Sequence, residues 1–171
     1  MVSLLLLFPL FGVTANRYMA WKEIQAATAE VEREAQIRDS QRDTWIATLR
    51  TPHKDWSRAA NEEAKISAAE SLEVFPEAAA ALAGAAVADP NPSVRSAAAW
   101  SLGRSQGAAK GAALLCLELK DEDPKRRANA AQALAAISAK VPGTRGSLEV
   151  ALSDSNGEVR AWSARALWKI S

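Results

Sequence analysis

Three Asp–Arg pairs recur along the second half of the chain at one spacing. In each pair the Arg follows the Asp by six residues, and the pairs are Asp89–Arg95, Asp121–Arg127 and Asp154–Arg160. A carboxylate and a guanidinium held together could take part in acid–base catalysis, or could form a charge-assisted hydrogen bond that joins two parts of a fold. Because the pair occurs three times in one register, we interpret it as architecture and predict no catalytic residue.

The pairs belong to a longer repeat. Successive Arg residues of the pairs are 32 and 33 positions apart, and small residues and Leu follow each Arg in register: Ala98, Ala130 and Ser163; Ala99, Ala131 and Ala164; Leu102, Leu134 and Leu167. Self-similarity at a period of this size indicates a solenoid of stacked units. The abundance of Ala, the best helix former, favours helical units over a sheet.

Each unit is predicted to be a helical hairpin. First helices are expected at 77–88, 108–119 and 144–152, and second helices at 93–104, 125–139 and 157–171. The turns before the second helices are rich in Asp, Asn, Pro and Gly, which break and cap helices. A degenerate unit precedes these, with a first helix near Trp45 to Leu49 and a second from about Trp56 to Phe75. It has Ala59 and Lys65 where later units have Asp and Arg.

The pattern D-x-x-x-x-V-R followed by A-x-x-A-L resembles the HEAT-like repeat family, in particular the short repeats of phycobilisome-lyase-type proteins. The resemblance covers about residues 76–171 well and 45–75 weakly. It implies an all-α solenoid of about four hairpins, preceded here by a long helix. It also implies a hydrogen-bonded ladder along the stack, made of Asp89, Arg95, Asp121, Arg127, Asp154 and Arg160, which we expect to stop before the degenerate unit.

Helical periodicity separates buried from exposed positions on the second helices. With Val94 at the centre of the buried face and about 100° per residue, Ala98, Ser101 and Leu102 are expected to point inward. The outward or sideways positions are Ser96, Trp100 and Gly103 in one unit, Ala128, Gln132 and Ala135 in the next, and Ala161, Arg165 and Trp168 in the last. Trp162 lies on a flank of the last helix.

The first fifteen residues, MVSLLLLFPLFGVTA, carry no charged side chain. A helix of this length falls short of the roughly 30 Å hydrocarbon core, but extension to Trp21 lengthens it, with Arg17, Tyr18 and Trp21 suited to the membrane interface. We expect residues 1–21 to be a retained membrane anchor or docking segment that contacts lipid. A cleaved signal peptide and a segment buried in a protein partner are the alternatives.

The side of the membrane stays open. Arg17 and Lys22 follow the apolar segment, which favours a cytoplasmic body, whereas a signal-like function of residues 1–15 would place the body outside the cytoplasm. Residues 22–50 contain no Gly or Pro and are mostly charged in the middle. They predict a long helix or stalk that merges into the first repeat, with the solenoid over residues 51–171.

Composition excludes several kinds of site. The chain has one His and one Cys, so a Cys/His zinc site within it is effectively excluded, and we expect no metal and no cofactor. Lys and Arg number 21 against 20 Asp and Glu, which lacks the basic surplus of a nucleic-acid-binding protein. We therefore expect no nucleic-acid partner.

The remaining surface signal is a group of aromatic and basic residues on the second helices. Trp100, Trp162, Arg165, Trp168 and Lys169 form a candidate protein-docking patch, although the Trp side chains could instead cap the stack over Ala-rich neighbours. The sequence favours a non-enzymatic scaffold or accessory subunit that binds a protein, as part of a larger membrane complex. The alternatives are a bilin or tetrapyrrole lyase-like or chaperone module, which the resemblance permits, and a nucleic-acid-binding HEAT-like protein.

Overall fold

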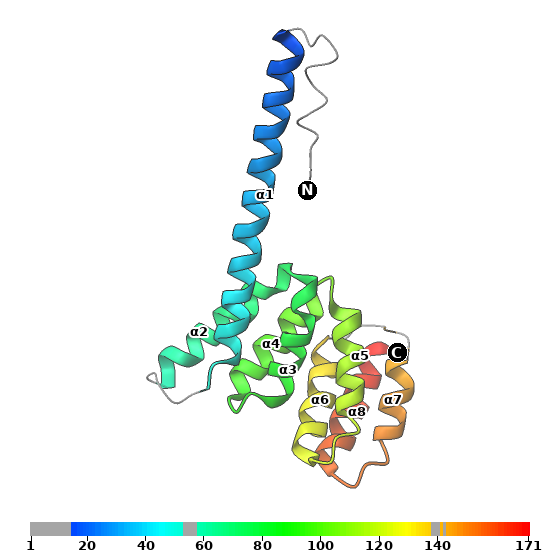
Figure 1. The fold of residues 1–171 in the computed structure, drawn as a ribbon. Coiled ribbons are helices and arrows are strands. Elements are labelled where there is room, and N and C mark those ends of the chain that lie inside the picture. The colour runs from blue at the N-terminus through cyan, green and yellow to red at the C-terminus, as the bar shows by residue number, and fades with distance from the viewer. Residues whose placement is uncertain (1–14, 53–57, 138–140, 142) are drawn as a thin grey trace. The chain divides into compact units, whose positions relative to one another are not determined.

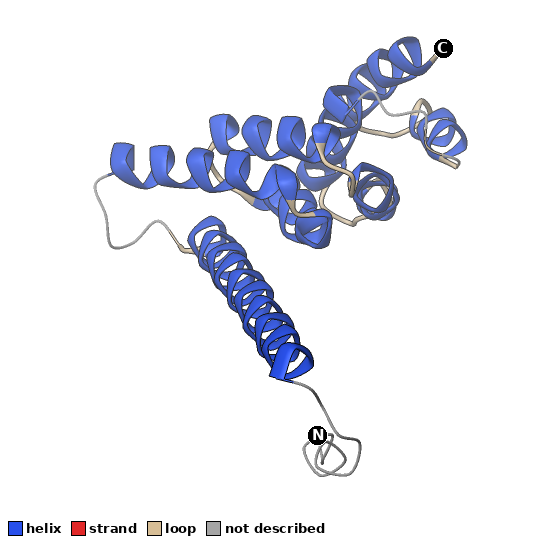
Figure 2. Cartoon of the chain, turned by 90° about the horizontal axis from the view of Figure 1, so that it is seen from above, coloured by secondary structure: helices blue, strands red, loops and turns tan. Residues whose placement is uncertain are grey.

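The computed structural model describes residues 15–52, 58–137, 141 and 143–171, and these residues contain helices and no strand (Figures 1 and 2). The α-helices are α1 (Ala15–Arg50), α2 (Arg58–Ser71), α3 (Ala79–Ala88), α4 (Pro92–Arg104), α5 (Ala108–Glu118), α6 (Pro124–Ile137), α7 (Thr144–Ala151) and α8 (Gly157–Ile170). Two short 3₁₀ turns, Leu72–Val74 and Pro76–Ala78, connect α2 to α3. The helices from α3 onward begin within two residues of their predicted starts, and α3, α4, α5, α7 and α8 end within one residue of their predicted ends. The predicted end of α6, at residue 139, lies outside the described residues.

The chain divides into two compact units, Met1–Gln41 and Arg42–Ser171. The described part of the first unit is residues 15–41 of α1. Apolar side chains such as Ile24 and Val31 are exposed there beside many charged ones. This part is therefore a solvated helix, as its charged middle predicts. The last turns of α1 belong to the second unit.

The second unit is a solenoid of two helical layers. Helix α4 packs between α2 and α6, and α6 packs between α4 and α8, so these second helices form one layer. The first helices α3, α5 and α7 form the other, with α5 between α3 and α7. Each first helix also packs on the second helix that follows it, as Figure 1 shows. The predicted all-α solenoid of about four hairpins is confirmed.

The last turns of α1 supply the first half of the degenerate hairpin. Leu49 is buried in the core, and the Trp45 ring meets the Phe75 ring edge-on with centroids 5.8 Å apart. Aromatic pairs favour this T-shaped arrangement. The start of the predicted second helix at Trp56 lies outside the described residues, and α2 continues that helix from Arg58.

The core lies between the two layers and is built mostly from Ala and Leu. Val94, Ala98 and Leu102 have no exposed surface, as their spacing on one face of α4 predicts. Ala128 and Ala135, expected to point outward or sideways, are buried instead. The expectation was wrong for them because α6 is covered by a second helix on each side, so more of its circumference is enclosed.

Candidate functional site

The turns before α4, α6 and α8 share one hydrogen-bonded geometry. In each, the carboxylate of the first Asp accepts the backbone N–H two residues later: Asp89 from Asn91 at 2.9 Å, Asp121 from Asp123 at 2.9 Å and Asp154 from Asn156 at 2.8 Å. The side chain of that later residue then caps the helix, as Asn91 Oδ1 does by accepting from Ser93 N at 2.8 Å. The recurring Asp-x-Asn/Asp in the sequence is the signal for this cap.

The six-residue spacing lets each Arg side chain bind the backbone carbonyl of the Asp in its own turn. The Nη1 atoms of Arg95, Arg127 and Arg160 donate to the carbonyl oxygens of Asp89, Asp121 and Asp154, each at 2.9 Å. Each Nη1 also donates to the next carbonyl along the chain. Within a unit, therefore, the Arg binds the backbone of the turn and leaves the carboxylate available to the preceding unit.

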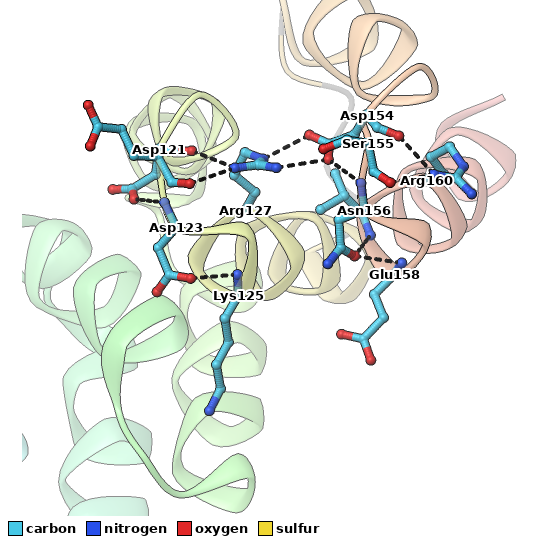
Figure 3. Close-up of polar contacts among 11 residues, drawn as sticks. Asp121, Asp123, Lys125, Arg127, Asp154, Ser155, Asn156, Glu158 and Arg160 are labelled. Carbon is cyan, nitrogen blue, oxygen red and sulfur yellow. Dashed lines mark hydrogen bonds and ion pairs between the residues drawn. The ribbon is translucent and has the colours of Figure 1, made fainter.

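Arg127 and Asp154 join two units side chain to side chain (Figure 3). Nε donates to Oδ2 at 2.8 Å and Nη2 to Oδ1 at 3.0 Å, a bidentate geometry that matches the planar guanidinium to the carboxylate. These hydrogen bonds hold the pKa of the Asp154 carboxyl below its ordinary value. The same pairing raises the pKa of Arg127. This is one rung of the ladder, from α6 to the turn before α8.

A second rung joins the degenerate unit to the next one. Lys65 Nζ lies 2.8 Å from Asp89 Oδ2, and both side chains are only 4% exposed. The expectation that the ladder stops before the degenerate unit is therefore wrong. Lys65 stands in the register of the later Arg residues, and an ammonium on α2 reaches the carboxylate of the next turn as the Arg127 guanidinium does.

The middle rung is interrupted. Asp121 Oδ2 accepts from Arg126 Nε at 3.0 Å, and Arg126 Nη2 also bonds Glu118 Oε2 at 2.6 Å. Arg126 stands at the repeat position that Val94 and Val159 occupy in the other units. This unit therefore has a second basic residue that competes for the Asp121 carboxylate. Among the described residues, Arg95 forms no hydrogen bond or ion pair with the Asp121 carboxylate, and its Nε is buried without a hydrogen-bond partner.

A groove crosses the second-helix layer between α4, α6 and α8. It encloses about 170 Å³, and small side chains such as Ala99, Ala133 and Ala136 form part of its lining. Trp100 lines it from α4 and Trp162 from α8. Its polar lining residues are Arg95, Ser96, Asn129, Gln132, Arg165 and Lys169. The structure thus brings together, from α4 and α8, four of the residues predicted as a docking patch.

The Trp residues differ in their surroundings. Trp162 is half-buried, packs against the core and carries the Arg165 guanidinium 5.5 Å from its ring centroid, a cation–π geometry. Trp100 is 59% exposed at the groove, and Trp168 is 78% exposed outside it. The alternative prediction, that the Trp side chains cap the end of the stack, agrees with Trp162, which packs against the core. It does not agree with Trp168, whose side chain is mostly exposed.

The residues expected at a membrane interface lie on the first turns of α1. Tyr18 and Trp21 stack with ring centroids 6.1 Å apart, Lys22 Nζ lies 5.3 Å from the Tyr18 centroid, and Arg17 is exposed. Within the described ranges, no helix is both long and apolar enough to cross a membrane. The apolar run 1–14 lies outside the described residues, as does His53.

Comparison with known families gives one match. The family described as HEAT repeats matches residues 54–135. The match runs through α2, α3, α4, α5 and α6, and the structure extends the same stacking to α7 and α8. A search of curated proteins found no match. The sequence and the structure together support a HEAT-like repeat solenoid, a class whose members are generally protein-interaction scaffolds.

Proposed function

We propose that the chain is a non-enzymatic scaffold or accessory subunit that binds a protein partner in the groove between α4, α6 and α8. The observation that carries the proposal is Trp100, a large aromatic side chain left mostly exposed at the edge of a groove. Partly exposed Trp beside Arg is the composition of protein-binding hot spots. A stack of short repeats offers such an extended face without any catalytic apparatus.

A photo-cross-linking experiment tests this proposal. The photoreactive residue p-benzoylphenylalanine replaces Trp100 in the full chain, expressed in its native cells and irradiated there. Val150 on α7 is the matched control, because it is an exposed apolar residue in the opposite helical layer. We expect a discrete protein adduct from position 100 and none from position 150. Adducts of equal yield from both positions, or none from position 100, would contradict the proposal.

We further propose that residues 1–21 attach the chain to a membrane or a membrane complex. The support is the uncharged run that ends at Arg17, followed by the stacked Tyr18 and Trp21. Replacing Leu5 and Leu6 by Asp is expected to release the full chain from washed membranes, because charged side chains are costly in hydrocarbon. Retention of this variant equal to that of the unaltered chain would argue against attachment through this segment.

Two other functions receive less support. Among the described residues, no group of His, Cys, Asp and Glu could hold a metal ion, and nothing specific favours tetrapyrrole handling. A nucleic-acid-binding function is not favoured by the charge of the chain, which has 21 Lys and Arg against 20 Asp and Glu.

A further inference from the structure

In the described part of the chain, the groove is lined by three cations and by no carboxylate. Arg95, Arg165 and Lys169 line it, and no Asp or Glu does. None of the three forms an ion pair within the described parts of the chain. Elsewhere in the solenoid, Lys65, Arg126 and Arg127 each have a carboxylate within 3.0 Å. The positive charge of the groove is therefore a local surplus on a chain with a formal net charge of only +1.

The contacts of these cations keep them at the groove. Arg95 donates to backbone carbonyls through Nη1, while its Nε has no acceptor among the residues described. Lys169 Nζ donates to the Ala135 carbonyl at 2.8 Å, and the Arg165 guanidinium lies against the Trp162 ring. Neutral carbonyls and an aromatic face orient a cation but leave its charge uncompensated, so an incoming carboxylate would be attracted.

We propose that the groove binds an acidic segment of a partner protein, in which Asp or Glu residues flank an apolar side chain. The carboxylates would pair with Arg165, Lys169 and Arg95, and the apolar side chain would lie between Trp100 and the Ala-rich lining. Charge complementarity of this kind selects partners and speeds association. The inference rests on the proposed function and names the chemistry of the partner at the same groove.

A nucleic acid fits the groove less well than an acidic peptide. Protein–DNA complexes commonly use about 6–10 phosphate contacts, whereas this groove offers three cations. Acidic residues also crowd the turn before α6, where Asp121, Glu122 and Asp123 follow one another. A phosphate backbone that extends from the groove to that turn would be repelled there.

The test is a selection from a random peptide display library on the full chain. The variant Arg165→Glu reverses one groove charge at an exposed position, and Lys110→Glu makes the same change on α5, away from the groove. Thermal melting of both variants verifies that they fold. We expect enriched peptides with Asp or Glu beside Leu, Phe or Trp, bound at least about tenfold more weakly by Arg165→Glu and unchanged by Lys110→Glu. Enrichment of neutral or basic peptides would overturn the proposal, as would binding unaffected by Arg165→Glu.

A titration with nucleic acids and the cross-link at position 100 distinguish an acidic peptide from other ligands of the groove. Single-stranded and duplex oligonucleotides are titrated against the same variants. The acidic-peptide inference would be overturned if either oligonucleotide bound more tightly than the selected peptides and if Arg165→Glu abolished that binding. Sequencing of the segment cross-linked at position 100 separates the two proposals. A protein adduct through a segment without carboxylates leaves the scaffold function standing and overturns only its acidic chemistry. Selected acidic peptides without any protein adduct in cells would contradict the scaffold function alone.

Discussion

Lys65 on α2 and Asp89 in the turn after α3 form a buried ion pair, with Nζ 2.8 Å from Oδ2 and each side chain only 4% exposed. The residues are 24 positions apart and belong to successive units. Asp89 also accepts the N–H of Asn91, so one carboxylate fixes both its own turn and the preceding helix. The pair attaches the degenerate first unit to the regular repeats.

Removal of the ammonium is expected to destabilise the solenoid strongly. Lys65→Met removes the ammonium that lies 2.8 Å from the buried Asp89 carboxylate. Removing one partner of a buried ion pair costs about 3–5 kcal/mol in comparable pairs. Urea unfolding followed by circular dichroism measures the loss. Asp89→Asn in the same background should recover part of it, because the amide oxygen can still accept from Asn91 while the buried charge is gone. A double-mutant cycle without coupling between the two positions would contradict this role.

The Arg127–Asp154 rung is expected to make stability depend on pH. Arg127 lowers the pKa of Asp154 from the ordinary value of 3.8, so the pair stabilises the fold fully above that value. The contribution is lost as the pH falls through the lower pKa of the folded state. At neutral pH, Asp154→Asn should lower the free energy of unfolding by about 1.5–3 kcal/mol, the range for hydrogen bonds to charged groups.

Denaturant unfolding of the unaltered chain and of Asp154→Asn from about pH 7 to about pH 3 measures this difference. The difference should shrink toward the acid end. A difference that stays constant with pH would show that the carboxylate charge does not stabilise the rung.

Gly107 is required by a close approach between units. A Cβ built there would lie 2.6 Å from the Pro76 carbonyl oxygen and 2.8 Å from Ala79 Cβ, so Gly107→Ala must displace backbone. We expect a destabilisation of about 1–3 kcal/mol, measured as a lower thermal midpoint. Gly84→Ala on α3 is the control, because a Cβ there meets nothing within 4 Å. It should stabilise the helix by about 0.5–1 kcal/mol, and equal effects of the two substitutions would contradict the packing argument.

Ser163 carries a buried hydroxyl that has no hydrogen-bond partner among the described residues. Ala98 and Ala130 occupy the same register in the preceding units and are fully buried. Ser163→Ala is therefore expected to raise the free energy of unfolding by about 1 kcal/mol, since it removes an unpaired polar group without changing the shape of the core. Unfolding in guanidinium chloride measures this change in the free energy of unfolding. A loss of stability in Ser163→Ala would indicate that the hydroxyl has a hydrogen-bond partner.

The local features of the solenoid could be predicted from the sequence. Helix limits follow from Pro, Asn and Asp in the turns, and the buried face of α4 follows from the spacing of Val94, Ala98 and Leu102. These properties depend on residues within one or two helical turns of each other. The candidate residues Trp100, Trp162, Arg165 and Lys169 were recognisable for the same reason, because large aromatic and basic side chains stood where periodicity placed no core.

The partners across units were decided by the tertiary structure. From the spacing, Arg95 is expected to pair with Asp121 just as Arg127 pairs with Asp154. In the structure, Arg126 binds the Asp121 carboxylate instead. The Asp89 carboxylate is bound by Lys65. Burial of Ala128 and Ala135 depends on helices that cover α6 from both sides. The groove likewise exists only where α4, α6 and α8 are stacked. Competition for one carboxylate and enclosure by neighbouring helices are properties of three-dimensional packing, which a repeat period does not encode.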